Sequence, residues 1–136
     1  MVLVDTNVLL DIATRDEKWF EWSSSKLATL INTREAAINP VIYAELAPCY
    51  RNERELDLNL VPPAKIKRLP LPYAAAFPAA RAFAAYRLSG GKRTSPLPDC
   101  FIGAHAEAEG LALLTRDPVR YRIYFPTVKI IAPSRH

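Results

Sequence analysis

Four acidic residues lie where a predicted strand or helix meets a turn. They are the strongest candidates in the sequence for catalysis or metal binding. The four are Asp5, Glu45, Asp99 and Asp117. An aspartate at the carboxyl end of a buried strand lies on the ligand-binding edge of an open α/β sheet. Asp5 follows the apolar run 2–4, and Asp117 follows the apolar run 111–114. We therefore expect these two carboxylates to meet at one edge of a sheet.

Each of these residues also has an ordinary structural explanation. Asp5 and Asp99 suit helix N-caps, and the pair Asp117-Pro118 suits a turn. The surroundings of Glu45 and Asp99 favour a functional interpretation. On a helix, the neighbours three and four positions from Glu45 are apolar, and those of Asp99 are apolar or small. We expect both carboxylates to face the interior edge of the fold.

A cluster of carboxylates needs a compensating positive charge. Two carboxylates about 4 Å apart repel by roughly 4 kcal/mol at an effective dielectric constant near 20. A site made only of acidic oxygens is the ligand set that Mg²⁺ or Mn²⁺ prefers. The sequence therefore predicts a divalent metal site. The alternative compensation is an arginine that reaches in from across the fold or from a bound partner.

The sequence offers little support for other catalytic groups. His136 is the last residue, and His105 on a predicted helix is expected to be packed or partly exposed. The serines at 23–25 lack the strand-to-helix glycine elbow of a serine hydrolase. Neither cysteine has a credible histidine partner, and no phosphate-binding glycine loop occurs. The predicted nucleophile is a water activated by the metal, whose coordination lowers the pKa of water.

The hydrophobic pattern predicts an α/β domain with a mostly parallel sheet, because strands and helices alternate. The predicted strands cover 2–4, 36–38, 65–69, 111–114 and 128–131. The predicted helices include a stretch that starts after Asp5 and the ranges 17–32, 40–48, 53–60, 73–88 and 99–109. No linker or repeat interrupts the pattern. We expect one domain over residues 1–136.

Composition agrees with a folded protein that has a mild preference for polyanions. The 136 residues are 50% hydrophobic and 24% charged, with a net charge of +4. Two cysteines without metal-ligand spacing predict neither a disulfide nor a zinc site. The amino terminus has no basic leader, and Asp5 interrupts its apolar run, so we expect no signal peptide and no membrane span. A cytoplasmic location is the expectation.

The acidic residues lie in four short motifs whose order is specific. They read Val-Asp-Thr-Asn-Val-Leu-Leu-Asp from Val4, Tyr-Ala-Glu ending at Glu45, Pro-Leu-Pro-Asp-Cys-Phe-Ile ending at Ile102, and Leu-Leu-Thr-Arg-Asp ending at Asp117. Together they resemble the PIN-domain ribonucleases, and most closely the VapC toxins of bacterial and archaeal toxin–antitoxin modules. The resemblance covers essentially the whole chain. Residues 51–85 match no motif.

The resemblance implies a three-layer α/β/α sandwich around a mostly parallel central sheet, and Mg²⁺- or Mn²⁺-dependent cleavage of RNA. It further implies a homodimer that a small cognate antitoxin of the VapB type inhibits. By position, the catalytic and metal-binding acids would be Asp5, Glu45, Asp99 and Asp117, with Asn7 and Thr115 as hydrogen-bonding support. The expected function is that of a metal-dependent endoribonuclease, the toxin of a type II toxin–antitoxin system.

Three basic residues are the candidates for contacts to RNA phosphates. Lys92 and Arg93 lie in the loop before Asp99, and Arg116 is adjacent to Asp117. Ordinary solvated charge explains Lys92 and Arg93 equally well, and Arg116 equally suits a structural ion pair. The alternative function is a PIN-like module that binds RNA or protein without cutting. Retention of all four acids argues against that alternative, because a non-cutting protein has no electrostatic reason to cluster them.

Overall fold

A five-stranded sheet in which every pairing is parallel forms the centre of the molecule. The computed structural model describes residues 1–60, 65–91 and 97–134. The strand order is β3-β2-β1-β4-β5. The strands are β1 (Val2–Val4), β2 (Ala36–Ile38), β3 (Lys67–Arg68), β4 (Ala112–Leu114) and β5 (Ile130–Ile131). The predicted α/β class and parallel sheet are confirmed.

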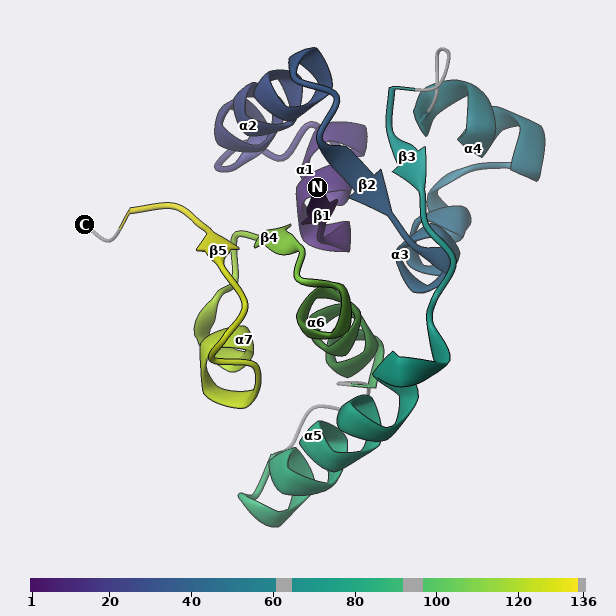
Figure 1. Cartoon of the computed structure of the whole chain (residues 1–136). Helices are drawn as coiled ribbons and strands as arrows, with labels where there is room; N and C mark the ends of the chain where they lie inside the picture. The colour runs from purple at the N-terminus through teal and green to yellow at the C-terminus, as the bar shows by residue number, and fades with distance from the viewer. Residues whose placement is uncertain (61–64, 92–96, 135–136) are drawn as a thin grey trace.

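Helices cover both faces of this sheet, so that the molecule is the expected three-layer α/β/α sandwich. Figure 1 shows α1 and α2 on one side of the sheet and α5, α6 and α7 on the other. The α-helices are α1 (Thr6–Ala13), α2 (Phe20–Asn32), α3 (Pro40–Leu46), α4 (Glu53–Leu60), α5 (Ala76–Leu88), α6 (Leu97–Glu109) and α7 (Val119–Tyr124). Short 3-10 turns are η1 (Ala47–Cys49) and η2 (Tyr73–Ala75). None of the described helices is long and apolar enough to cross a membrane.

The central strands are apolar at every position because both of their faces are covered. Leu3 and Val4 of β1 are fully buried, as are Leu113 and Leu114 of β4. The first strand pairs with β2 on one side and with β4 on the other. This arrangement places the residues that follow β1 and β4 next to each other.

Helices α6 and α7 approach each other closely at Gly103. A Cβ atom at this position would lie 2.3 Å from the ring of Phe125, the residue that caps the carboxyl end of α7. A larger side chain would force the two elements apart. The glycine therefore permits the close packing that brings residues of α7 up to α6.

Several predicted boundaries were wrong by two or three residues. The helix predicted at 17–32 begins at Phe20, because Asp16 Oδ1 accepts hydrogen bonds from the backbone N–H groups of Lys18 and Trp19 and forms a turn. The helix predicted at 99–109 begins at Leu97, with Pro98 in its first turn, where a proline has no hydrogen bond to lose. Asp99 therefore lies within the first turn of the helix rather than ahead of it.

The edge strands are shorter than predicted, and one helix was missed. The strands predicted at 65–69 and 128–131 cover only Lys67–Arg68 and Ile130–Ile131. Each is an outer strand that pairs on one side alone. Helix α7 follows Pro118 and was not predicted, because its sequence alternates polar and apolar residues as a strand does.

Candidate active site

The site lies where the direction of the chain through the sheet reverses. The connection after β1 leads to β2 on one side, and the one after β4 leads to β5 on the other. Ligands of open α/β sheets bind at such a switch point, beyond the carboxyl ends of the strands. Val4 is in register with Leu114, so Asp5 and Thr115 emerge side by side. The Thr115 hydroxyl donates a hydrogen bond of 2.8 Å to Asp5 Oδ2.

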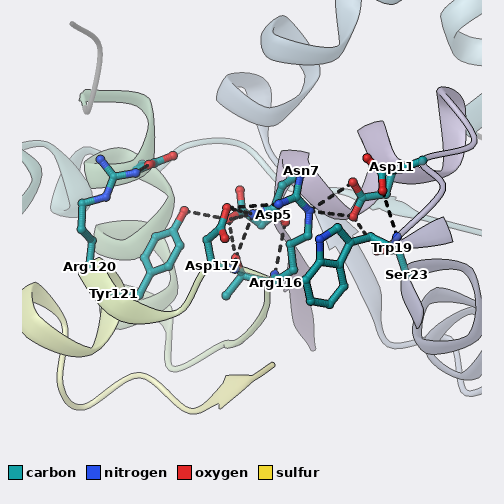
Figure 2. A network of polar contacts seen from close by, with 12 residues as sticks. Asp5, Asn7, Asp11, Trp19, Ser23, Arg116, Asp117, Arg120 and Tyr121 are labelled. Atoms are coloured by element: carbon teal, nitrogen blue, oxygen red, sulfur yellow. Dashed lines mark hydrogen bonds and ion pairs between the residues drawn. The ribbon is translucent and has the colours of Figure 1, made fainter. Parts of the chain in front are cut away.

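Asp5 is the most enclosed of the four acids, with 4% of its surface exposed. Its Oδ2 atom accepts from three side chains, as Figure 2 shows for the surrounding network. The Tyr121 hydroxyl donates at 3.0 Å and Asn7 Nδ2 at 3.4 Å, in addition to Thr115. The two residues predicted to support the acids by hydrogen bonding therefore both contact Asp5.

The electrostatic surroundings make ionisation of Asp5 unfavourable. Burial, followed by the charge of Asp99, raises its pKa from 3.8 to about 7 even though Thr115 and Tyr121 favour the charged form. Burial and Asp99 likewise raise the pKa of Glu45, against a lowering by the Thr6 hydrogen bond. Burial and the charges of Asp5, Asp99 and Glu45 raise the pKa of Tyr121 well above its ordinary value. Three acids on separate helices or strands thus share one electrostatic environment.

Helix α3 carries Glu45 to the site and is fixed at its start by Asn39. The Asn39 side chain accepts from the backbone N–H of Ile42 at 2.9 Å and lies 3.0 Å from Nδ1 of the fully buried His105 on α6. Glu45 itself is half-buried and accepts a hydrogen bond of 2.6 Å from the Thr6 hydroxyl. His105 therefore has a packed, structural position, as expected, and its contacts tie α6 to α3.

Asp99 makes an ion pair with an arginine that the sequence did not single out. Arg120 on α7 donates from Nη2 to Asp99 Oδ2. About a quarter of each side chain is exposed, 24% for Arg120 and 26% for Asp99. An arginine from across the fold is thus one source of the positive charge that the acid cluster needs.

Asp117 lies at the rim of the site, with 65% of its side chain exposed. Its backbone N–H donates to the Thr115 hydroxyl at 3.1 Å, and Asn7 Nδ2 lies 3.5 Å from Oδ2. Asn7 and Thr115 each contact both Asp5 and Asp117. The two aspartates are therefore linked through shared neighbours.

Arg116 forms a structural ion pair, one of the two roles expected of it. Its Nε lies 3.1 and 2.9 Å from the two carboxylate oxygens of Asp11, which is 2% exposed. Its Nη1 lies 3.5 Å from Asp117 Oδ2. A contact between Arg116 and RNA stays a prediction. Lys92 and Arg93, the other two predicted RNA contacts, lie outside the described residues.

The donor chemistry of the site fits a hard divalent cation. Its candidate ligands are carboxylate oxygens. Burial and the charge of Asp99 raise the pKa of Asp5, and a cation bound beside this carboxylate would favour its charged form. As the side chains stand, no three carboxylates, imidazoles or thiols among residues 1–60, 65–91 and 97–134 are close enough together to hold one ion. Binding would require side chains to move and to exchange their present contacts, such as that of Glu45 with Thr6 or that of Asp99 with Arg120.

Four contributors to the site were not assigned a role from the sequence. They are Thr6, Asp11, Arg120 and Tyr121. Thr6 and Asp11 lie in the first motif, but their partners Glu45 and Arg116 are distant in sequence. Arg120 and Tyr121 lie on the helix that was missed, and the sequence pattern there gave no signal of their position.

Comparison with known proteins identifies the family to which the chain belongs. The family profile described as the PIN domain matches residues 2–126. A search of curated proteins finds no match. Among solved structures, VapBC2 from Rickettsia felis bound to a promoter DNA fragment aligns at a TM-score of 0.70 with 17% identity, covering 98% of this chain and 100% of that one.

Two further structures have the same fold. A toxin–antitoxin complex from Klebsiella pneumoniae aligns at a TM-score of 0.70 with 18% identity over all of both chains. FitAcB from Neisseria gonorrhoeae aligns at 0.65 with 22% identity over 96% of each chain. At these identities the likeness establishes the fold.

Proposed function

Because this chain belongs to the PIN-domain family, we propose that it is a metal-dependent endoribonuclease that acts as the toxin of a type II toxin–antitoxin system in the cytoplasm. The observation that carries the proposal is Asp5, a buried carboxylate at the switch point whose pKa is raised to about 7. A buried carboxylate at this position that had no functional role would only destabilise the fold. Its position is accounted for if it binds a cation.

In the proposed mechanism the protein holds the acids in place and an ion supplies the charge. Asp5, Asp99, Glu45 and Asp117 would hold Mg²⁺ or Mn²⁺, which supplies electrostatic stabilisation and activation of water for in-line hydrolysis of a phosphodiester. Thr115, Tyr121 and Asn7 orient the Asp5 carboxylate through Oδ2. Such supporting hydrogen bonds hold metal-ligating carboxylates in place.

Removal of divalent ions tests the proposal directly. We expect the purified chain to cleave single-stranded RNA in the presence of Mg²⁺ or Mn²⁺, and EDTA to abolish the cleavage. Excess Mn²⁺ added after EDTA should restore it. Gel analysis of a labelled RNA measures the cleavage rate. Binding of RNA without cleavage under all of these conditions would instead support the non-cutting alternative.

A partly apolar groove between α1, α2 and α4 is the proposed docking surface for an antitoxin segment. The groove has a volume of about 1010 Å³. Its apolar lining includes Leu9, Ile12, Leu27, Ile31, Leu60 and Ile66. Ile12 and Ile31 are partly exposed in the groove, and the other four apolar residues are buried beneath it. An apolar groove between helices suits the apolar face of a segment from another protein. The similar structures are solved as toxin–antitoxin assemblies, which supports this kind of partner.

A charge placed in the groove should separate toxicity from neutralisation. Ala28 is exposed on α2 and lines the groove. Expression of the chain is expected to arrest bacterial growth, and co-expression of the small protein encoded beside its gene should relieve the arrest. Ala28→Arg should keep the arrest but weaken this relief, with at least about a tenfold loss of affinity for the isolated antitoxin.

Ser25→Arg is the matched control, because Ser25 is exposed on the same helix and is not part of the groove lining. Growth curves and calorimetric titration give the two readouts. Equal neutralisation of all three proteins would show that the antitoxin binds elsewhere.

A further inference from the structure

Arg120 contacts both the acid site and helix α5. It lies on α7, next in sequence to Tyr121, and the two side chains reach different acids of the site. Tyr121 donates to Asp5 (Figure 2). Arg120 Nη2 donates to Asp99. Arg120 also lies over the ring of Tyr86 on α5, with 5.7 Å between Cζ and the ring centroid. Its guanidinium is therefore held between α5 and α6, beside a predicted metal ligand.

One end of this guanidinium is placed unfavourably. Nη1 of Arg120 is buried and has no hydrogen-bond partner, the only such buried side-chain nitrogen or oxygen among the described residues. A buried donor of a charged group without a partner is destabilising. The attraction between Arg120 and Asp99 and the contact with the Tyr86 ring are the interactions that offset this loss. Neutralisation of Asp99 by another cation would remove the ion pair and leave the contact with Tyr86, which weakens the hold on the side chain.

We propose that Arg120 is an internal counter-ion that competes with the divalent metal for Asp99. The inference rests on the proposed function, because it concerns the same metal site. In the metal-free protein Arg120 supplies the positive charge beside Asp99. A metal ion bound to Asp99 repels the guanidinium and takes over its role, which frees Arg120 to move toward solvent. The freed guanidinium is then at the mouth of the site, where an RNA phosphate would lie.

Binding of Mn²⁺ to the purified full chain, measured by calorimetry and by electron paramagnetic resonance, tests this proposal without any need for catalysis. Arg120→Met keeps most of the apolar stem and removes the charge. We expect this variant to bind Mn²⁺ about 5-fold more tightly than the wild type, since the strength of a partly exposed ion pair limits the gain. Arg120→Lys, which keeps a charge, should stay closer to the wild type.

Arg122→Met is the matched control. It removes the same charge from the same helix, and Arg122 is exposed. It should leave Mn²⁺ affinity within about 2-fold of the wild type, which excludes an effect of net charge alone. In an Asp99→Asn background the gain in Mn²⁺ affinity from Arg120→Met should disappear, because the carboxylate for which Arg120 and the metal compete is absent.

The outcomes separate this inference from the proposed function. Unchanged or weaker Mn²⁺ binding by Arg120→Met overturns the competition and assigns Arg120 to the support of Asp99, while the metal site stands. Failure of the wild-type chain to bind Mn²⁺ at all overturns both. Thermal unfolding of each variant without metal verifies that it is folded.

Discussion

Asp5→Asn is expected to lower the rate of metal-dependent RNA cleavage by about 1000-fold or more. The amide is nearly isosteric with the carboxylate but removes the negative charge at the centre of the site. The Thr115 and Tyr121 hydroxyls, which lie 2.8 and 3.0 Å from Asp5 Oδ2, can still donate to the amide oxygen. The loss should therefore reflect charge and metal binding rather than collapse of the local structure.

The same substitution should make the metal-free protein more stable at neutral and alkaline pH. The pKa of Asp5 is about 7 in the folded protein against 3.8 for an ordinary aspartate. Between these values the folded state holds a proton that the unfolded chain has released, so the free energy of unfolding falls as the pH rises from about 4 to 7. Above about 7 the loss is complete and amounts to at most about 4 kcal/mol. Asp5→Asn does not suffer this loss.

Urea unfolding from pH 4 to pH 8.5 in EDTA measures this effect, alongside RNA cleavage in Mg²⁺. Glu21→Gln, which neutralises an exposed acid on α2, is the control for a change in net charge. An Asp5→Asn protein that is destabilised at pH 8 would show that the carboxylate stabilises the fold. An Asp5→Asn protein that still cleaves RNA would contradict the catalytic assignment.

Arg116→Met is expected to lower the free energy of unfolding by about 3 kcal/mol. The substitution leaves the Asp11 carboxylate, 2% exposed, without the guanidinium whose Nε lies 2.9 Å from Oδ2. The Ser23 hydroxyl, at 2.8 Å, would be its remaining side-chain donor. A buried charge that loses its partner is among the largest single-residue losses known for stability.

The pair joins α1 to the loop that carries Asp117, so RNA cleavage should fall as well, by about tenfold. Arg122→Met should change the unfolding free energy by less than about 0.5 kcal/mol, because Arg122 is exposed. Urea unfolding at pH 7 compares the two variants. If Arg116→Met has the same free energy of unfolding as Arg122→Met but a much lower affinity for RNA, Arg116 binds RNA and does not stabilise the fold.

The sequence was informative where one residue type at one position determines the structure. An aspartate directly after an all-apolar run predicted both the strand and its functional edge, and Asp5 lies there. The supporting role of Asn7 and Thr115 was predicted from the resemblance alone, and both residues contact Asp5. Parallel strands with short connections leave few other places for these side chains.

The contacts that depend on packing between helices distant in sequence could not be predicted from the sequence. Arg120 reaches Asp99 because α7 packs against α6 at Gly103, and nothing in the sequence near Arg120 encodes that contact. The alternating pattern of α7 favours a strand, and tertiary packing overrides it. The divalent ion that was predicted as the compensation for the acids stays a prediction, whereas an arginine, the alternative, does lie beside Asp99.

The hydrogen bonds to Asp5 span nearly the whole chain. Its partners Thr115 and Tyr121 lie 110 and 116 positions later in the sequence. During synthesis on the ribosome, the surroundings of Asp5 therefore form only after β4 and α7 have been made. A truncated chain that lacks β4 and α7 should therefore leave the Asp5 carboxylate without these two donors.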